Sequence, residues 1–362
     1  MDSSASMERA APASPASAAL WFSSPRRFRS WLRGLPGHLG AAITVTALFC
    51  ITVLVIALVY KAPLSIPRER VSAALGLNAV LPVAFAMALY AGLRFYKSLT
   101  GRLDPKDPPL LQAIAVDMTL MGLFLVTTYF HFSLKTWVQV INPRLYDDVY
   151  FAIDKDLQPV LDLFYWIRIN IFELMPGVDA WYQAAFLLMF ITGFCSLAIT
   201  RSRYYPQFCI GVLLTLSIGG LSYLVAPAVG PFIYEAGLNQ QATEAQAVMY
   251  WAHRQAIEYG MPWIAQAGSG YFTGGLAAMP SLHIAQAVTM TYFILRAGSP
   301  LFGLFLFICL WVTVESVASR WHYLIDLPVG LALSVLVIWL SNHLCRERRP
   351  AAAGTPDMVD RI

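Results

Sequence analysis

The sequence predicts an all-α, polytopic membrane protein with about eight transmembrane helices. Hydrophobic residues make up 58% of its 362 residues and charged residues only 13%, whereas an average soluble domain is about one quarter charged. The apolar residues also fall in blocks of about 20, the length that a helix needs to cross a bilayer. These observations exclude an ordinary soluble domain and a disordered chain. The formal net charge of +4 is too small and too scattered for a nucleic-acid partner.

Eight apolar segments are predicted to span the membrane. They are 41–60, 72–94, 111–130, 180–200, 206–226, 281–297, 301–318 and 323–343. Residues 1–40 precede the first span and are rich in Ala, Ser and Pro and then in Arg, so we expect a largely disordered tail. Residues 344–362 form a second tail after the last span.

The distribution of basic residues predicts the sidedness of the chain. If the N-terminal tail lies inside and the spans alternate, the inner segments hold 16 of the 25 Lys and Arg residues. Positive charge collects on the cytoplasmic side of a membrane, so both tails are predicted to be cytoplasmic. The long connections 131–179 and 227–280 then lie on the outer face, where we expect the functional site. Short inner connections and the lack of eukaryotic sorting signals favour a bacterial inner membrane.

Two stretches of the outer connections are predicted to be helices that do not cross the membrane. The stretch 157–174 is apolar but carries charged residues, Arg168 among them, which favours a helix lying on the membrane. The stretch 239–258 has the pattern of a second amphipathic helix, with Gly260 just beyond its end. A ninth span at 157–174 would invert the topology of everything that follows.

The first segment with a chemical motif is Gly274–His283, GGLAAMPSLH, at the start of the sixth predicted span. Pro280 suits the first turn of a helix, because its missing N–H would have no partner there. The free backbone N–H groups around Ser281, together with its hydroxyl, would form an anion site at a helix N-terminus. His283 would lie one turn in, at the mouth of the span. Taken alone, the segment is more typical of a plain helix start with a structural histidine.

The second segment is Ser319–Gly330, SRWHYLIDLPVG, which opens the eighth predicted span. His322 and Asp326 are four residues apart, so on a helix the carboxylate could reach the ring. A carboxylate on one ring nitrogen fixes the tautomer and leaves the other nitrogen free to attack. The guanidinium of Arg320 could donate two parallel hydrogen bonds to phosphate oxygens. Alone, this is also compatible with an incidental His and Asp, but in the predicted topology both segments meet at the outer headgroup plane.

These two segments resemble the type-2 phosphatidic-acid phosphatase superfamily, whose signature is Lys-x6-Arg-Pro, Pro-Ser-Gly-His and Ser-Arg-x5-His-x3-Asp. Pro-Ser-Leu-His and His-Tyr-x-x-Asp are more similar to its branch of inositol phosphorylceramide and sphingomyelin synthases. The resemblance implies a six-helix catalytic core at 111–343, preceded by two additional transmembrane helices at 41–110. It implies no cofactor and no metal ion.

The resemblance also implies a role for each matching residue. His322 would be the nucleophile that takes the phosphoryl group, and Asp326 would orient it. His283 would protonate the leaving alkoxide. Ser281 and Arg320 would bind phosphate oxygens. Phosphoryl transfer chiefly needs such positioning and charge neutralisation.

The chain departs from the signature at its cations. It lacks Lys-x6-Arg-Pro, and Phe232 stands where related bacterial proteins have an arginine. Arg320 stands two residues before His322 instead of six, so it need not be the family's phosphate arginine. Arg254 could substitute, or could be a solvated loop arginine. Glu315, inside the seventh span, could pair with Arg320, read a headgroup hydroxyl or be structural.

The function predicted from the sequence is transfer of a phosphoryl or phospho-headgroup between membrane lipids, which serve as donor and acceptor. The route would be a phosphohistidine intermediate at the outer face. One alternative is a lipid phosphate phosphatase acting on phosphatidate-like or polyprenyl phosphates. Others are a non-catalytic lipid-binding protein and a transporter, although a transporter site would lie near the midplane between repeats. Nothing in the sequence indicates the headgroup or the oligomeric state.

Overall fold

The computed structural model describes residues 37–68, 76–102 and 110–346. Within them the chain forms eleven α-helices, a few short 3-10 turns and no strand. The predicted tails lie almost entirely outside the described residues. The helices are α3 (Gly37–Tyr60), α4 (Gly76–Leu99), α5 (Leu110–Ile141), α6 (Asp147–Asp156), α7 (Gln158–Asn170), α8 (Val178–Ile199), α9 (Tyr205–Ser222), α10 (Gln240–Ala267), α11 (Leu282–Arg296), α12 (Phe302–Ala318) and α13 (Asp326–Leu344).

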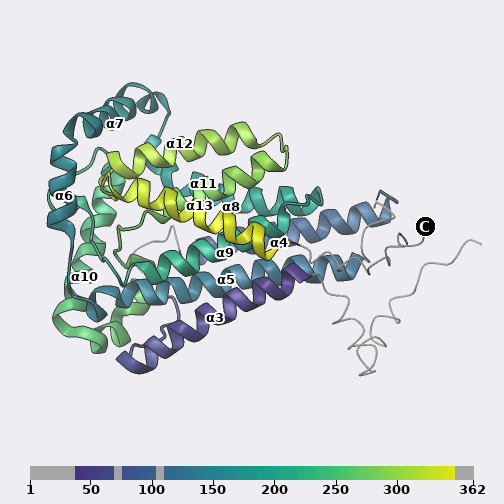
Figure 1. Cartoon of the computed structure of the whole chain (residues 1–362), viewed down its shortest axis with the longest axis horizontal. Coiled ribbons are helices and arrows are strands. Elements are labelled where there is room, and N and C mark those ends of the chain that lie inside the picture. Colours follow the sequence, from purple (N-terminus) through teal and green to yellow (C-terminus); the bar gives the residue numbers. More distant parts are fainter. Residues whose placement is uncertain (1–36, 69–75, 103–109, 347–362) are drawn as a thin grey trace, which may run out of the picture.

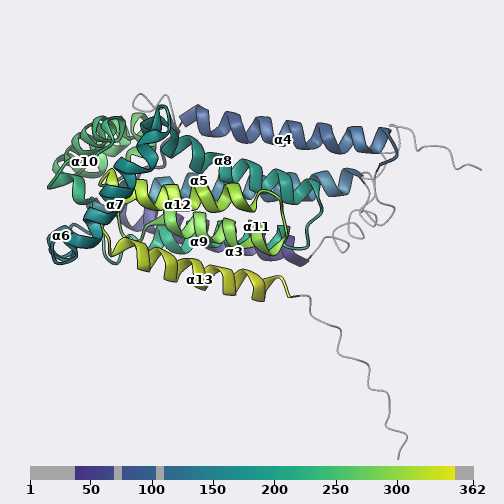
Figure 2. The same cartoon turned by 90° about the horizontal axis from the view of Figure 1, so that it is seen from above.

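Eight of these helices run along the long axis as a bundle, and α6, α7 and α10 gather at one end of it (Figures 1 and 2). The eight bundle helices are α3, α4, α5, α8, α9, α11, α12 and α13, and each coincides with one predicted span. Helix α3 begins and α13 ends at the opposite end of the bundle (Figure 1). The ends of the described chain therefore lie together, as the predicted topology requires.

The polytopic all-α prediction is confirmed. Among the described residues, five helices are long and apolar enough to cross a membrane, namely α3, α5, α8, α9 and α13. Helix α12 is apolar but shorter. The predicted spans 72–94 and 281–297 also form helices, α4 and α11, but neither meets that criterion among the described residues. Several apolar helices of this kind make the chain an integral membrane protein.

Helix α9 lies at the centre of the bundle and packs against α3, α5, α11 and α13. Most of its residues are buried, and many of them are small: Gly211, Thr215, Ser217, Gly219 and Gly220. In a membrane, small residues let neighbouring helices approach closely, which increases van der Waals contact. The helix that follows the first inner connection of the predicted core is therefore also the axis on which the others pack.

Helix α5 is longer than predicted. The sequence places its end at residue 130, but the helix continues to Ile141. The extra turns bury His131, Leu134 and Trp137 against α9 and α10. A charged and polar stretch that is typical of a loop is thus kept helical by tertiary packing. Lys135 consequently lies on this helix and not in an outer loop.

The outer helices also differ in extent from the prediction. The stretch 157–174 forms α7 and a following 3-10 turn at the end of the bundle, and it is not among the candidate spans. Helix α10 does not stop before Gly260 but continues to Ala267 through a kink. Gly260 adopts φ 65° and ψ −155°, a conformation open to glycine, and Pro262 follows it inside the helix.

A buried arginine fastens α7 to the bundle. Arg168 Nε donates to Glu315 Oε2 at 2.7 Å, Nη2 donates to Asp179 Oδ1 at 2.5 Å, and Nη1 pairs with Glu173. Glu315 also accepts from Asn239 Nδ2 at 2.5 Å. Of the roles considered for Glu315, the structure therefore shows a structural one. Glu315 pairs with Arg168 and not with Arg320, because Arg168 reaches it from a helix that sequence spacing does not connect to α12.

Replacing Arg168 with Met should destabilise the fold by about 3–5 kcal/mol, because Glu315 would remain buried without its counter-ion. We expect a clear fall in the unfolding temperature in detergent. The exposed Arg203 provides the matched control, and Arg203→Met should leave that temperature unchanged. Adding Glu315→Gln to Arg168→Met should restore part of the loss. An Arg168→Met protein as stable as the control would refute a structural role for the cluster.

Candidate active site

The first motif ends in a capped helix. Ser281 is fully buried and is the N-cap of α11, with its Oγ accepting from Ile284 N–H at 3.4 Å. Helix α11 begins at Leu282, so Pro280 lies outside the first turn that the sequence predicts for it. The serine hydroxyl therefore already serves the helix start, and its phosphate-binding role stays a prediction.

The second motif begins with a helix end that usually requires glycine. Arg320 adopts φ 58° directly after the C-cap of α12. Its N–H donates to Val317 O at 2.9 Å and Trp321 N–H donates to Ser316 O at 3.1 Å, the pairing of a Schellman motif. A side chain in this left-handed region costs on the order of 1–3 kcal/mol. Something must hold the arginine there.

Two carboxylates hold Arg320. Its Nη1 donates to Asp154 Oδ2 at 2.9 Å, and its Nη2 lies 2.9 Å from Glu235 Oε1. The guanidinium is fully buried. In this structure it balances one carboxylate of α6 and one of the segment before α10, and its phosphate-binding role stays a prediction. Arg254 is exposed on α10, and its phosphate role likewise stays a prediction without a contact to the motifs.

The three predicted catalytic side chains lie in contact. Asp326 Oδ2 is 3.1 Å from His322 Nδ1 and also accepts from Tyr323 N–H at 3.0 Å. His322 Nε2 is 3.2 Å from His283 Nδ1. Helix α13 begins only at Asp326, so the His–Asp contact is made across a turn and not along a helix face. With Nδ1 held by the carboxylate, Nε2 is the nitrogen left to react, and it faces His283.

Aromatic rings set the position of His283. The rings of Tyr182 and Phe186, both on α8, lie 5.2 and 4.8 Å from its ring, centroid to centroid. His322 is 4% exposed, whereas His283 is only partly buried. The pair therefore lies at the edge of the packed interior, with the His283 ring held from the side by α8.

The close approach of the two motifs depends on Gly330. A Cβ at this position would lie 2.6 Å from the backbone oxygen of Ser281. The starts of α11 and α13 are also joined by a hydrogen bond, in which Ser281 N–H donates to Asp326 O at 3.4 Å. A glycine is thus required where α13 passes the start of α11.

Helix α6 contributes two buried aspartates that the sequence analysis missed. Asp147 accepts from the Val229 and Gly230 N–H groups and from the Tyr323 hydroxyl, at 2.7–3.0 Å. Asp154 accepts from Leu324 N–H at 2.8 Å as well as from Arg320.

Both aspartates therefore bind residues of the loop that carries His322. Burial raises the pKa of the Asp154 carboxyl, while the bonds from Leu324 and Arg320 oppose that shift. The spacing of Asp147 and Asp154 along one face of an outer helix is visible in the sequence. Nothing local indicates which loop that face covers.

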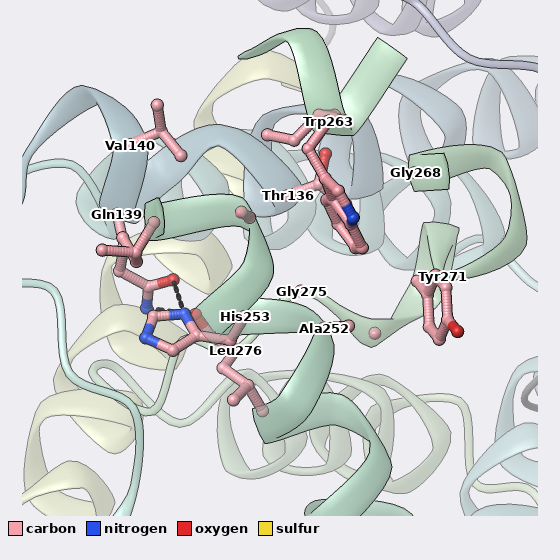
Figure 3. Close-up of a pocket in the computed structure, with 14 residues that line it drawn as sticks. Thr136, Gln139, Val140, Ala252, His253, Trp263, Gly268, Tyr271, Gly275 and Leu276 are labelled. Atoms are coloured by element: carbon pink, nitrogen blue, oxygen red, sulfur yellow. Dashed lines mark hydrogen bonds between the residues drawn. The ribbon is translucent and has the colours of Figure 1, made fainter. Parts of the chain in front are cut away.

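A small pocket, partly open to solvent, lies beside the first motif (Figure 3). Its walls come from α5, α10 and residues 268–276, and they are mainly apolar. Gln139 Nε2 donates to Leu276 O at 2.5 Å, and Gln139 Oε1 is 3.1 Å from His253 Nδ1. Burial, and the charge of Arg254, lower the pKa of His253 to about 4. A neutral His253 thus helps Gln139 to hold the motif segment.

A match to a known protein family covers both motif segments. Residues 172–340 match the family model of the PAP2 superfamily. No curated protein and no solved structure matches the chain. The resemblance to the type-2 phosphatidic-acid phosphatases is thereby confirmed at the level of the superfamily, over a segment that contains both motifs. The synthase branch stays a prediction. Among the described residues, no group of three or more His, Cys, Asp or Glu is placed to hold a metal ion.

Gly330→Ala should separate the two motifs, because the new methyl group meets the Ser281 carbonyl. We expect catalysis to fall about 100-fold, as a displacement of 1 Å can cause, with a loss of stability of about 1–3 kcal/mol from overpacking. The control is Gly303→Ala on α12, where a Cβ meets nothing within 4 Å. Equal activity of the two variants would show that the approach is not needed.

Asp154→Asn keeps an acceptor for Leu324 N–H but removes the counter-ion of Arg320. We expect kcat/KM to fall about 10- to 100-fold, because the loop that carries His322 loses its anchor. The measurement compares initial rates with those of Asp156→Asn, a change at an exposed aspartate of the same helix. If both variants match the unmodified protein, α6 does not position the histidine.

Proposed function

We propose that this protein transfers a phosphoryl or phospho-headgroup between membrane lipids through a phosphohistidine on His322, at the outer face of the membrane. The match to the PAP2 superfamily supports an enzyme that acts on phosphoesters. The observation that carries the finer proposal is the line Asp326–His322–His283, with contacts of 3.1 and 3.2 Å.

In the first step the lone pair on His322 Nε2 attacks the phosphorus, and the bond from phosphorus to the leaving alkoxide breaks. Asp326 keeps the proton on Nδ1 and stabilises the cation that the ring becomes. His283, on the far side of Nε2, gives its proton to the leaving oxygen. The contact between the two rings must open to admit the phosphoryl group, which places the reacting atoms between them.

In the second step His283 accepts the proton of an incoming hydroxyl, whose oxygen attacks phosphorus while the P–N bond breaks. A lipid alcohol as acceptor gives transfer, and water gives hydrolysis. The site chemistry serves both acceptors. The preference for transfer is based on the motifs Pro-Ser-Leu-His and His-Tyr-x-x-Asp, which resemble those of the synthase branch.

The outer location is supported by the arrangement of the chain. The motifs begin α11 and α13 at the bundle end where α6, α7 and α10 gather (Figure 1). That end carries the long connections that charge distribution predicts to be outside. Lipid headgroups would reach the histidines there without entering the bundle.

The test uses detergent-purified protein and phospholipids labelled at phosphorus, with ceramide or diacylglycerol added or left out. Label entering a new lipid only when an acceptor is present supports transfer. Release of labelled phosphate or headgroup regardless of acceptor would show hydrolysis. His322→Ala should lose all turnover, whereas His343→Ala, at an exposed histidine of α13, should lose none. Equal turnover of wild type and His322→Ala would overturn the proposal.

A second measurement isolates the role of His283. On a lipid ester with an alkyl leaving group, His283→Ala should be about 10²- to 10⁴-fold slower than wild type, the usual contribution of a general acid. On a p-nitrophenyl ester, whose leaving group needs no proton, the defect should shrink to a small fraction of that. His322→Ala should stay inactive on both esters. A His283→Ala defect of the same size on both would contradict the acid role.

A further inference from the structure

The reacting histidines have a cationic neighbour that neither motif contains. Lys135 lies on the part of α5 that extends beyond the predicted span. Its charge acts on His283, close enough for an electrostatic interaction. Its Nζ lies 5.7 Å from the centre of the Tyr223 ring, and Tyr223 in turn interacts electrostatically with Asp326. Lys135 therefore faces the same group of side chains as the catalytic line.

The backbone fixes this placement. A Cβ on Gly275 would lie 2.8 Å from the carbonyl carbon of Lys135 and 2.9 Å from its oxygen. The first motif thus packs directly on α5 at this turn. One turn earlier, His131 Nδ1 is 3.0 Å from Leu216 O, which fixes α5 against α9. Lys135 is held beside the motif by its own helix and not by a loop.

No carboxylate pairs with Lys135 among the described residues. Within the described part of the chain, Lys135 instead interacts with the Tyr223 ring and with the two histidines His131 and His283. A partly buried ammonium without a counter-ion is costly to desolvate. The binding of an anion next to the ammonium would offset that desolvation cost.

The two buried arginines near the second motif are already balanced. Arg320 contacts Asp154 and Glu235, and Arg168 contacts three carboxylates. Asp326 carries the one negative charge in the catalytic line, and Lys135 offsets it only at a distance. Among the described residues, Lys135 is therefore a positive charge within electrostatic range of His283 that no carboxylate balances.

On the basis of the proposed function, we propose that Lys135 binds the reacting phosphate and that its single charge matches a phosphodiester, not a phosphomonoester. A phosphodiester lipid carries one negative charge, whereas a free phosphomonoester approaches two. The ammonium would sit against the non-bridging oxygens and stabilise the charge that they share in the transition state. Lys135 lies outside the residues that match the superfamily, so the match does not assign it this role.

The first experiment varies the charge on enzyme and substrate together. An alkyl p-nitrophenyl phosphate diester carries one charge, and the matched alkyl p-nitrophenyl methylphosphonate carries none. Lys135→Gln should lower kcat/KM about 100-fold on the charged ester and little on the uncharged one. Lys135→Arg should recover most of the activity. The control is Lys61→Gln, at an exposed lysine after α3, which should match wild type on both.

The second experiment measures binding without turnover. In the His322→Ala protein, phosphatidylmethanol in mixed micelles should raise the unfolding temperature more than phosphatidic acid at equal concentration. Adding Lys135→Gln should abolish that rise.

The outcomes separate the two proposals. An equal loss on charged and uncharged esters, or an unchanged temperature rise in Lys135→Gln, would overturn the role of Lys135. A stronger effect of phosphatidic acid would overturn the phosphodiester preference. If His322→Ala turns over the esters as wild type does, the proposed function itself fails, whatever Lys135 does.

Discussion

The site depends on the contact between the starts of α11 and α13. His283 lies in the first turn of α11 and His322 in the turn just before α13, and the two rings can meet only if these segments approach within van der Waals distance. Gly330 permits this because a Cβ there would lie 2.6 Å from Ser281 O. The resulting bond from Ser281 N–H to Asp326 O ties the first motif to the residue whose carboxylate contacts His322. Positioning of this kind is the main protein contribution to phosphoryl transfer.

The outer helices act as a frame for that contact. Charged groups buried far from water are stable only when paired, and here the pairs join separate elements. Asp147 accepts from the Tyr323 hydroxyl, Asp154 accepts from Leu324 N–H and from the Arg320 side chain, and Arg168 ties α7 to Glu315 of α12. The strained backbone of Arg320 is part of the same frame, since its guanidinium holds α6 while its carbonyl accepts from Phe232 N–H at 3.2 Å. Arg320, which the sequence suggests as a phosphate-binding residue, therefore stabilises the loop that carries His322 through its ion pairs.

A good part of the fold could be predicted because lipid imposes a simple rule. Every backbone polar group in a bilayer must be satisfied within its own segment, so apolar blocks of about 20 residues become helices. Outside the apolar blocks, where this rule does not apply, the ends of the helices were predicted less accurately. Helix α5 continues past its apolar block because Trp137 and Leu134 find partners on other helices. Helix α10 continues through Gly260 for a similar reason, since Ile264 and Trp263 pack against the same cluster.

The sequence by itself determined the all-helical class, the eight bundle helices and the two motifs that carry His283, His322 and Asp326, since these follow from local composition and short spacing. Only the tertiary structure decided which charges are free and which are paired. Arg320 and Glu315 each found partners more than 70 positions away, on α6, on α7 and before α10. Lys135, on α5, came to lie within electrostatic range of His283. Long-range pairing of this kind leaves no local pattern, because it depends on how the helices pack and not on the residues that surround each charge.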